Sequence, residues 1–269
     1  MRILPTGSVG AAAAFIALAA TPARAQIDYR NLDDDRPTRV EDAYPAERYA
    51  FEFLLPYSYA RARGGAVVQA SVLELEYGVF RNAHIGVKAP LAAVRAGGST
   101  TTGLSGLRAF ALYNVNTEGR FLPAIALRAD AAFPIGSLGG DETQIAIKGI
   151  LTRSWGRNRL HLNGAVRVAG GDPGPAVEGV EDWWYGGAID HTLFRQSVLV
   201  VGEVYALRPA SAAPVEVNAS LGLRWQWRPT TVLDVGISRG LRNGLGPNYA
   251  VTVGISNAFA IAGLMPRGR

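Results

Sequence analysis

Histidine is the side chain of this sequence best suited to acid–base chemistry, and the chain has three, at His84, His161 and His191. His191 directly follows Asp190, and a histidine beside a carboxylate can serve as a general base in hydrolysis. The three histidines are far apart and lack the spacing of metal ligands on one strand. We therefore predict no catalytic residue and no metal or cofactor site, with a lipid hydrolase built on His191 as an alternative.

Motifs of other enzymes and of nucleic-acid-binding proteins do not occur in the sequence. Cysteine is absent, which excludes thiol nucleophiles, cysteine-based metal sites and disulfide scaffolds. Gly244-Leu245-Gly246 lacks the third glycine of a dinucleotide-binding loop, and there is no phosphate-binding loop. The formal net charge of +5 is mild and the arginines are dispersed, so we predict no nucleic-acid partner.

A set of charged residues could act together, because they share one side of the strands predicted below. The predicted lumen-lining residues are Glu74, Glu76, Lys88, Arg108, Arg128, Asp130, Lys148, Arg167, Asp190, Glu203, Arg224 and Asp234. A tight turn at residues 81–83 would bring Lys88 opposite or diagonal to two glutamates of this set. A second turn, Pro229-Thr230, would bring Arg224 close to Asp234. Such pairs could brace a wall or line the path of a solute, and the sequence leaves both roles open.

The elements that would position these charges are β-strands, because the hydrophobic pattern has a period of two from residue 48 onward. Tyr49, Phe51, Phe53 and Leu55 alternate with polar or mixed positions, and the same alternation recurs along the chain. Successive strand side chains point to opposite faces, so one face is apolar and the other polar. We count about twelve such strands, which predicts an all-β transmembrane antiparallel up-and-down β-barrel.

The connections between the predicted strands alternate between short and long. The short ones are residues 81–83, 116–120, 156–159, 195–197 and 229–230, and the long ones are 60–65, 95–103, 134–142, 170–182, 208–215 and 241–248. Outer-membrane barrels have short periplasmic turns and longer external loops, so both termini are predicted to be periplasmic. Aromatic residues on the apolar face gather at the strand ends, as expected for two girdles at the membrane interfaces.

The sequence divides into four predicted parts. Residues 1–25 form a signal peptide, because a short apolar run precedes Ala23-Arg24-Ala25, and cleavage is expected after Ala25. Residues 26–47 are acidic and aperiodic, and we interpret them as a periplasmic N-terminal segment that is either disordered or tucked into the mouth of the barrel. Residues 48–259 form the barrel, and 260–269 form a C-terminal tail. This organisation predicts location in the outer membrane, with its lipid as a partner.

Four short motifs resemble one family of transport proteins. They are Arg36-Pro37-Thr38, Glu41-Asp42-Ala43-Tyr44, Leu75-Glu76-Tyr77-Gly78 and Val201-Gly202-Glu203-Val204-Tyr205. The motifs occur in this order, and an alternating first strand follows the second motif. In these features the chain is similar to the MetA-pathway phenol-degradation family of outer-membrane transporters. The resemblance implies a barrel with a transport role. The chain departs from the usual end of such barrels, since Phe259 is followed by ten further residues instead of closing the chain.

The predicted function is a channel or transporter for small molecules, aromatic or hydrophobic ones included. A barrel of about 8 strands is filled by side chains and one of 16 to 18 strands holds an open channel, so about twelve strands predict a narrow lumen. The alternatives are an outer-membrane lipid hydrolase and a structural barrel without transport. The sequence does not name the solute.

Overall fold

The architecture comes from a computed structural model, which describes residues 26–171, 181–193, 197–209, 214–242 and 246–265. The predicted signal peptide, residues 1–25, lies outside this part of the chain, as do portions of the predicted connections 170–182, 195–197, 208–215 and 241–248. No helix within the described residues is long and apolar enough to cross a membrane.

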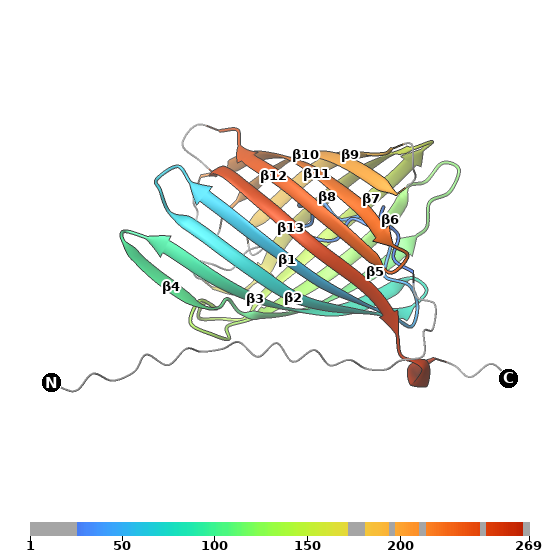
Figure 1. Ribbon diagram of the computed structural model, residues 1–269, viewed down its shortest axis with the longest axis horizontal. Helices are drawn as coiled ribbons and strands as arrows, with labels where there is room; N and C mark the ends of the chain where they lie inside the picture. The colour runs from blue at the N-terminus through green and yellow to red at the C-terminus, as the bar shows by residue number, and fades with distance from the viewer. Residues whose placement is uncertain (1–25, 172–180, 194–196, 210–213, 243–245, 266–269) are drawn as a thin grey trace.

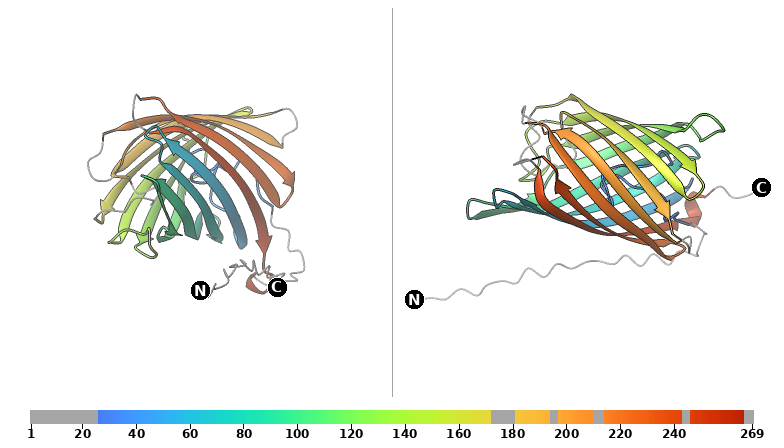
Figure 2. Two further views of the ribbon diagram at one scale, coloured as in Figure 1. Left: turned by 60° about the vertical axis from the view of Figure 1, so that its left-hand side comes forward. Right: turned by 90° about the horizontal axis from the view of Figure 1, so that it is seen from above.

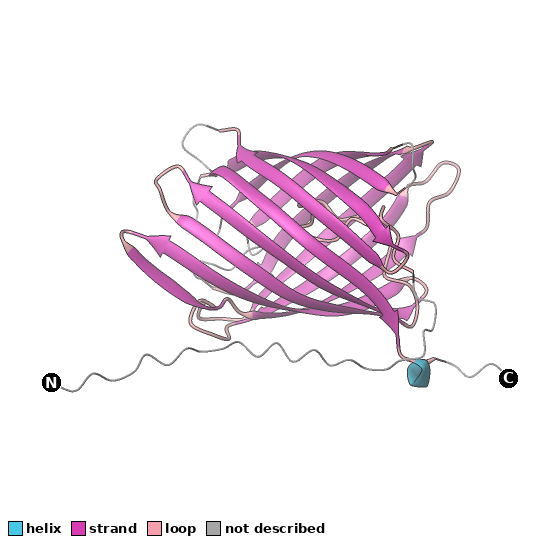
Figure 3. Ribbon diagram, in the orientation of Figure 1, coloured by secondary structure: helices cyan, strands magenta, loops and turns pink. Residues whose placement is uncertain are grey.

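Strands dominate the described residues, as the secondary-structure colouring of Figure 3 shows. Figure 1 labels them. They are β1 (Ala50–Ala62), β2 (Val67–Phe80), β3 (Ala83–Ala96), β4 (Ser99–Leu104), β5 (Leu107–Asn116), β6 (Ala124–Phe133), β7 (Gln144–Trp155), β8 (Asn158–Ala169), β9 (Trp183–Thr192), β10 (Val198–Arg208), β11 (Glu216–Arg228), β12 (Thr231–Gly240) and β13 (Pro247–Ala260). A short 3-10 helix, Ala262–Leu264, follows β13.

The strands close into a single antiparallel barrel. Apart from β4 and β5, neighbours in sequence pair with one another, and β1 pairs with both β2 and β13, which closes the sheet on itself. β4 and β5 both pair with β3, along successive stretches of it, and act as one wall strand interrupted at Ser105-Gly106. The wall is therefore a closed 12-stranded barrel, which confirms the predicted fold class.

The two faces of the wall differ as the period of two requires. On β11, Leu221 is 63% exposed on the outside while its neighbour Ser220 is 7% exposed inside. Exposed leucine, isoleucine, valine and aromatic side chains cover the outer face of the other strands as well. An apolar outer band with a polar interior is the pattern of a barrel that contacts lipid.

Aromatic rings stack at both ends of the outer face. Near one end Phe51 lies between Tyr77 and Phe259, with ring centroids 4.6 and 5.4 Å apart. Near the other end Tyr59 stacks on Tyr249 with a centroid separation of 6.0 Å. Rings at both strand ends match the interfacial girdles expected of a membrane barrel.

The predicted long connection 95–103 is wrong. These residues continue the ladder between β3 and β4, with Ala96 opposite Ser99. Gly97 and Gly98 have φ values of 58° and 83°, the left-handed conformations that a two-residue hairpin turn requires and that glycine adopts without strain. The predicted short turn 116–120 is instead a longer connection, which runs from the end of β5 at Asn116 to the start of β6 at Ala124.

Candidate functional site in the lumen

Residues 26–47, which we call the lumen segment, run inside the barrel. Figures 1 and 2 show this segment (blue) within the wall. Ile27, Leu32 and Val40 are at most 2% exposed, and they pack against inward-facing apolar residues such as Leu199 and Val232. The segment therefore fills part of the lumen that the strands enclose.

The wall leaves room for this segment by placing glycine where the two backbones meet. Gly78 lies on β2 against the backbone of Glu47, and Gly236 lies on β12 against the backbone carbonyl of Pro37. A side chain at either glycine would overlap the segment, because no Cβ fits at such a distance. The inner surface is thus shaped to hold the segment in the lumen.

Hydrogen bonds from the lumen segment end on side chains of the wall. The segment has little secondary structure of its own, so its buried N–H groups need such partners. The N–H groups of Arg39 and Val40 each donate to one oxygen of Glu203, at 2.8 Å. The N–H of Glu41 donates to Asn163 Oδ1 at 2.9 Å, and the N–H of Ala43 donates to the Thr152 hydroxyl at 3.0 Å. The N–H of Ala46 donates to His84 Nδ1 at 3.0 Å. Glu203 and His84 therefore bind this chain's own backbone.

Asp34 is the centre of the largest ion cluster in the described lumen. Its carboxylate lies 2.6 Å from Lys148 Nζ, 3.2 Å from Lys88 Nζ and 3.3 Å from the Arg128 guanidinium. Burial opposes ionisation of Asp34, but Lys148, Arg128 and Lys88 outweigh it and hold the pKa of this carboxyl well below its usual value. The cluster ties the lumen segment to β3, β6 and β7.

Glu41 adds a second carboxylate from the lumen segment to the same cations. Its oxygens lie 2.9 Å from Arg128 Nη1 and 2.5 Å from Lys148 Nζ. Arg128 also contacts Asp130 at 2.8 Å, and its guanidinium lies over the ring of Phe110, 3.8 Å from the centroid. The cations of β6 and β7 are thus neutralised mainly by residues from outside the wall.

The turn at residues 229–230 predicts that Arg224 lies close to Asp234, but each forms its ion pair with a residue of the lumen segment. The register places them directly opposite each other on β11 and β12. However, Arg224 Nη1 binds Asp33 at 2.9 Å, and Asp234 Oδ2 lies 3.6 Å from Arg36 Nη1. Asp33 and Arg36, themselves an ion pair, stand between the two wall residues. By contrast, Lys88 lies opposite Glu74, at 3.2 Å.

A buried chain of polar groups joins β7, β8 and β9. Asp190 Oδ2 lies 2.9 Å from His161 Nε2, and His161 Nδ1 lies 3.0 Å from the Thr152 hydroxyl. This order of groups resembles a catalytic triad, but Thr152 and His161 are fully buried and Thr152 accepts the N–H of Ala43. No solvent or solute reaches the hydroxyl, so the chain of groups holds the lumen segment.

His191 lies on the outer face, as its strand parity predicts, and is exposed. Its Nδ1 lies 2.9 Å from Asn158 Oδ1. The residues directly opposite it on the two neighbouring strands are Asn158 and Val200, so neither paired position supplies a nucleophile. Within the described residues, this geometry does not favour a hydrolase built on His191.

All predicted lumen-lining residues occupy the inner parity, and they differ in their partners. Ten are at most 9% exposed, while Asp130 and Arg167 are partly exposed. Arg167 lies apart from the central clusters and contacts Asp182 near the long-connection end. The sequence reasoning missed Glu52, Arg159 and the buried acids of the lumen segment. The signal that could have found those acids is the run Asp33-Asp34-Asp35, which lies a short distance before the first strand.

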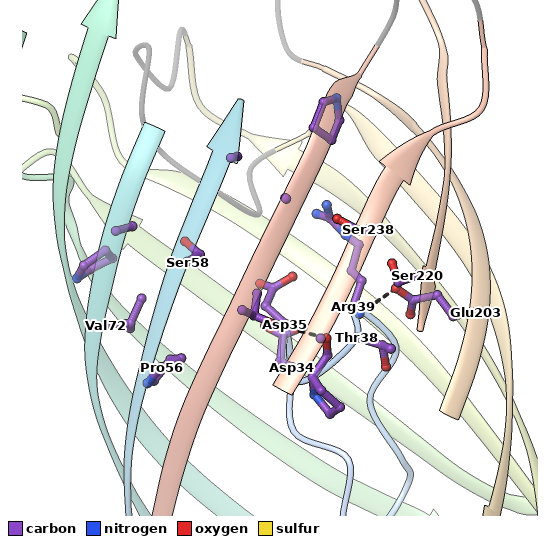
Figure 4. Close-up of a pocket in the computed structure, with 18 of the residues that line it drawn as sticks. Asp34, Asp35, Thr38, Arg39, Pro56, Ser58, Val72, Glu203, Ser220 and Ser238 are labelled. Atoms are coloured by element: carbon purple, nitrogen blue, oxygen red, sulfur yellow. Dashed lines mark hydrogen bonds between the residues drawn. The ribbon is translucent and has the colours of Figure 1, made fainter. Parts of the chain in front are cut away.

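A cavity of about 220 Å³ lies beside the lumen segment, and Figure 4 shows its lining. Asp34 and Asp35 border it from the segment, while Pro56 and Val72 border it from β1 and β2. Its remaining lining extends to Ala60 and other residues toward the long-connection end of the wall. The lumen thus holds a small space with one charged side and one apolar side.

Comparison with solved structures places this barrel among known ones. The crystal structure of the COG4313 outer membrane channel from Pseudomonas putida F1 aligns over 85% of this chain and 100% of its own, with a TM-score of 0.61 and 13% identity. The chain has the fold of an outer-membrane β-barrel. The KdgM porin aligns over 77% of this chain and 99% of its own, with a TM-score of 0.53 and 12% identity. The NanC porin covers 76% and 98%, with a TM-score of 0.52 and 8% identity. The sequence matches no protein-family profile and no curated protein.

Proposed function

We propose that this protein is an outer-membrane channel for small solutes, with a lumen narrowed by its own N-terminal segment. The observation that carries the proposal is the interior of the barrel. A 12-stranded wall encloses charged side chains and a solute-sized cavity, where a smaller barrel would be filled by side chains alone. The proposed partner is a small molecule, and the protein has no enzymatic role.

The solutes that we propose have an apolar or aromatic body. Pro56, Val72 and Pro90 form an apolar side of the cavity, and the ring of Tyr205 borders it as well. The resemblance to the MetA-pathway phenol-degradation family supports the same class. The small volume favours molecules of this kind over oligomers.

The main competing function is a structural barrel without transport. The dense ion pairs between the lumen segment and the wall favour it, because they would brace the barrel as well as narrow it. The two functions differ in one measurable respect, which is whether solute and ions cross a bilayer that contains the protein.

Reconstitution of the mature protein in planar bilayers tests the proposal. We expect a small, selective conductance, well below that of a general porin, because the lumen segment occupies much of the cross-section. Liposomes that contain the protein should also take up arabinose slowly. A barrel that is folded but passes neither ions nor arabinose, both as isolated and after removal of the lumen segment, would support the structural function instead.

We further propose that the mature chain begins at Gln26. The backbone nitrogen of Gln26 lies 3.4 Å from Glu47 Oε2, so cleavage after Ala25 would place a new α-ammonium group beside a carboxylate. This ion pair supports cleavage after Ala25, which is the position that the sequence predicts. The intact mass of protein isolated from outer membranes should correspond to residues 26–269. A mass that includes residues 1–25 would show that the predicted signal peptide is retained.

A further inference from the structure

The cavity beside the lumen segment has eight charged residues in its lining, and their pairing is informative. They are Asp34, Asp35, Arg39, Glu74, Lys88, Arg108, Glu181 and Glu203. A charge that is buried without a partner is unfavourable, so an unpaired charge in such a lining indicates what a solute would need to supply.

Six of these eight residues have an ion-pair or hydrogen-bond partner within the protein. Lys88 lies 3.2 Å from both Asp34 and Glu74. Arg39 Nη2 lies 2.6 Å from Glu181 Oε1. Glu203 accepts two backbone N–H groups of the lumen segment. Asp35 and Arg108 are the two that are left.

Arg108, on β5, is a buried cation without an ion pair among the described residues. Its side chain borders both the main cavity and a smaller one of about 30 Å³. The residue is 9% exposed, and its Nε and Nη2 have no hydrogen-bond partner in the part of the chain that the structure describes. Its neighbours in the register are Lys88 and Ala132, neither of which offers a negative charge. A solute carboxylate would satisfy these donors in the bidentate way that guanidinium groups favour.

Asp35, on the lumen segment, is the anionic counterpart and lines the same two cavities. Figure 4 shows Asp35 among the residues that line the main cavity. Within the described residues it forms no hydrogen bond or ion pair. Burial raises the pKa of this carboxyl and the charge of Asp34 raises it further, so a cation bound nearby would favour its ionised form.

We propose that the cavity binds a small zwitterion, whose carboxylate contacts Arg108 and whose ammonium group contacts Asp35. The apolar body of the solute lies against Pro56, Val72 and Pro90. This inference rests on the proposed channel function and specifies the head group of its solute. Each of the two protein charges selects one end of the ligand, and each rejects a molecule that lacks that end.

Titration calorimetry with three probes of one shape tests the assignment on the mature protein in detergent. L-phenylalanine carries both charges, 3-phenylpropionate only the carboxylate, and phenethylamine only the ammonium group. We expect L-phenylalanine to bind about tenfold more tightly than either of the others, because each loses one charge-assisted hydrogen bond.

Two variants that each remove one of the two charges should each abolish one of these differences in affinity. Arg108→Gln should weaken binding of L-phenylalanine about tenfold, to the affinity of phenethylamine, which should not change. Asp35→Asn should weaken binding of L-phenylalanine similarly, to the affinity of 3-phenylpropionate, which should not change. Arg95→Gln, at an exposed arginine of β3 outside the cavity lining, is the matched control and should bind all three probes like the wild type.

Two results would overturn the proposal. One is equal binding, or no binding, of the three probes by the wild type. The other is an unchanged order of affinities in both variants, which would mean that Asp35 and Arg108 satisfy each other through water. Either result leaves the channel function standing if arabinose and ions still cross bilayers that contain the protein. Loss of that flux alone would count against the channel and leave the binding site intact.

Discussion

Deletion of residues 26–47 is expected to raise the single-channel conductance of the barrel several-fold. The lumen segment carries buried side chains such as Leu32 and Val40 and spans the interior between β2, β7 and β11. Without it, a barrel of twelve strands should hold a continuous aqueous path, intermediate between the filled lumen of about 8 strands and the open pore of 16 to 18. Planar-bilayer recordings of the deletion variant and the full mature chain measure the difference.

The deletion variant must first be shown to be folded. A closed barrel resists detergent until it is heated, so the variant should migrate on gels differently with and without boiling. Removal of Asp34 and Glu41 also leaves Lys148 without its two anions, while Lys88 and Arg128 keep Glu74 and Asp130. A folded deletion variant whose conductance equals that of the full chain would show that the lumen segment does not narrow the pore.

The substitution Asp34→Asn should have the next largest effect, and it changes one functional group without altering side-chain shape. The amide leaves the cations of Lys88, Arg128 and Lys148 clustered around a neutral group. Removing one partner of a buried ion pair costs about 3–5 kcal/mol. We expect the lumen segment to leave its site more often, which recordings would show as frequent transitions to a larger conductance.

Asp28→Asn is the matched control for this substitution. Asp28 belongs to the same segment and pairs with Arg30, but their side chains are 44% and 50% exposed. Exposed ion pairs contribute about 0–1 kcal/mol, so this variant should record like the wild type. Equal behaviour of the Asp28 and Asp34 variants would show that the ion cluster does not hold the segment in the lumen.

The pKa of Asp34 also predicts how the wild type responds to pH. This pKa lies well below the usual value of 3.8. The carboxylate therefore stabilises the docked segment fully at every pH above 3.8. Its contribution is lost only as the pH falls through the lowered pKa. The transitions expected of Asp34→Asn should therefore occur at neutral pH in the variant, while those arising from protonation of Asp34 should occur in the wild type only in strong acid.

The sequence by itself determined the strands and the faces of the wall. Side-chain direction in a strand depends only on the position of a residue along it, so the alternation around Leu221 and Leu223 was sufficient to place Arg224 inside. The tight turn at residues 81–83 placed Lys88 opposite or diagonal to Glu74 and Glu76, since such a turn limits the register of the strands that it joins, and the structure pairs Lys88 with Glu74. Even the missed hairpin at residues 95–103 carries a local signal, the pair Gly97-Gly98.

Only the tertiary structure decided where the lumen segment lies and which charges it pairs. The segment has no periodicity, and its partners are distant in sequence, with Asp34 and Lys148 separated by 114 residues and Asp33 and Arg224 by 191. No local rule relates such positions, because they become neighbours only when β1 and β13 pair and enclose the segment. The sequence therefore shows that Arg224 faces the lumen, whereas the closed barrel determines that its partner there is Asp33 and that Arg108 has no ion-pair partner among the described residues.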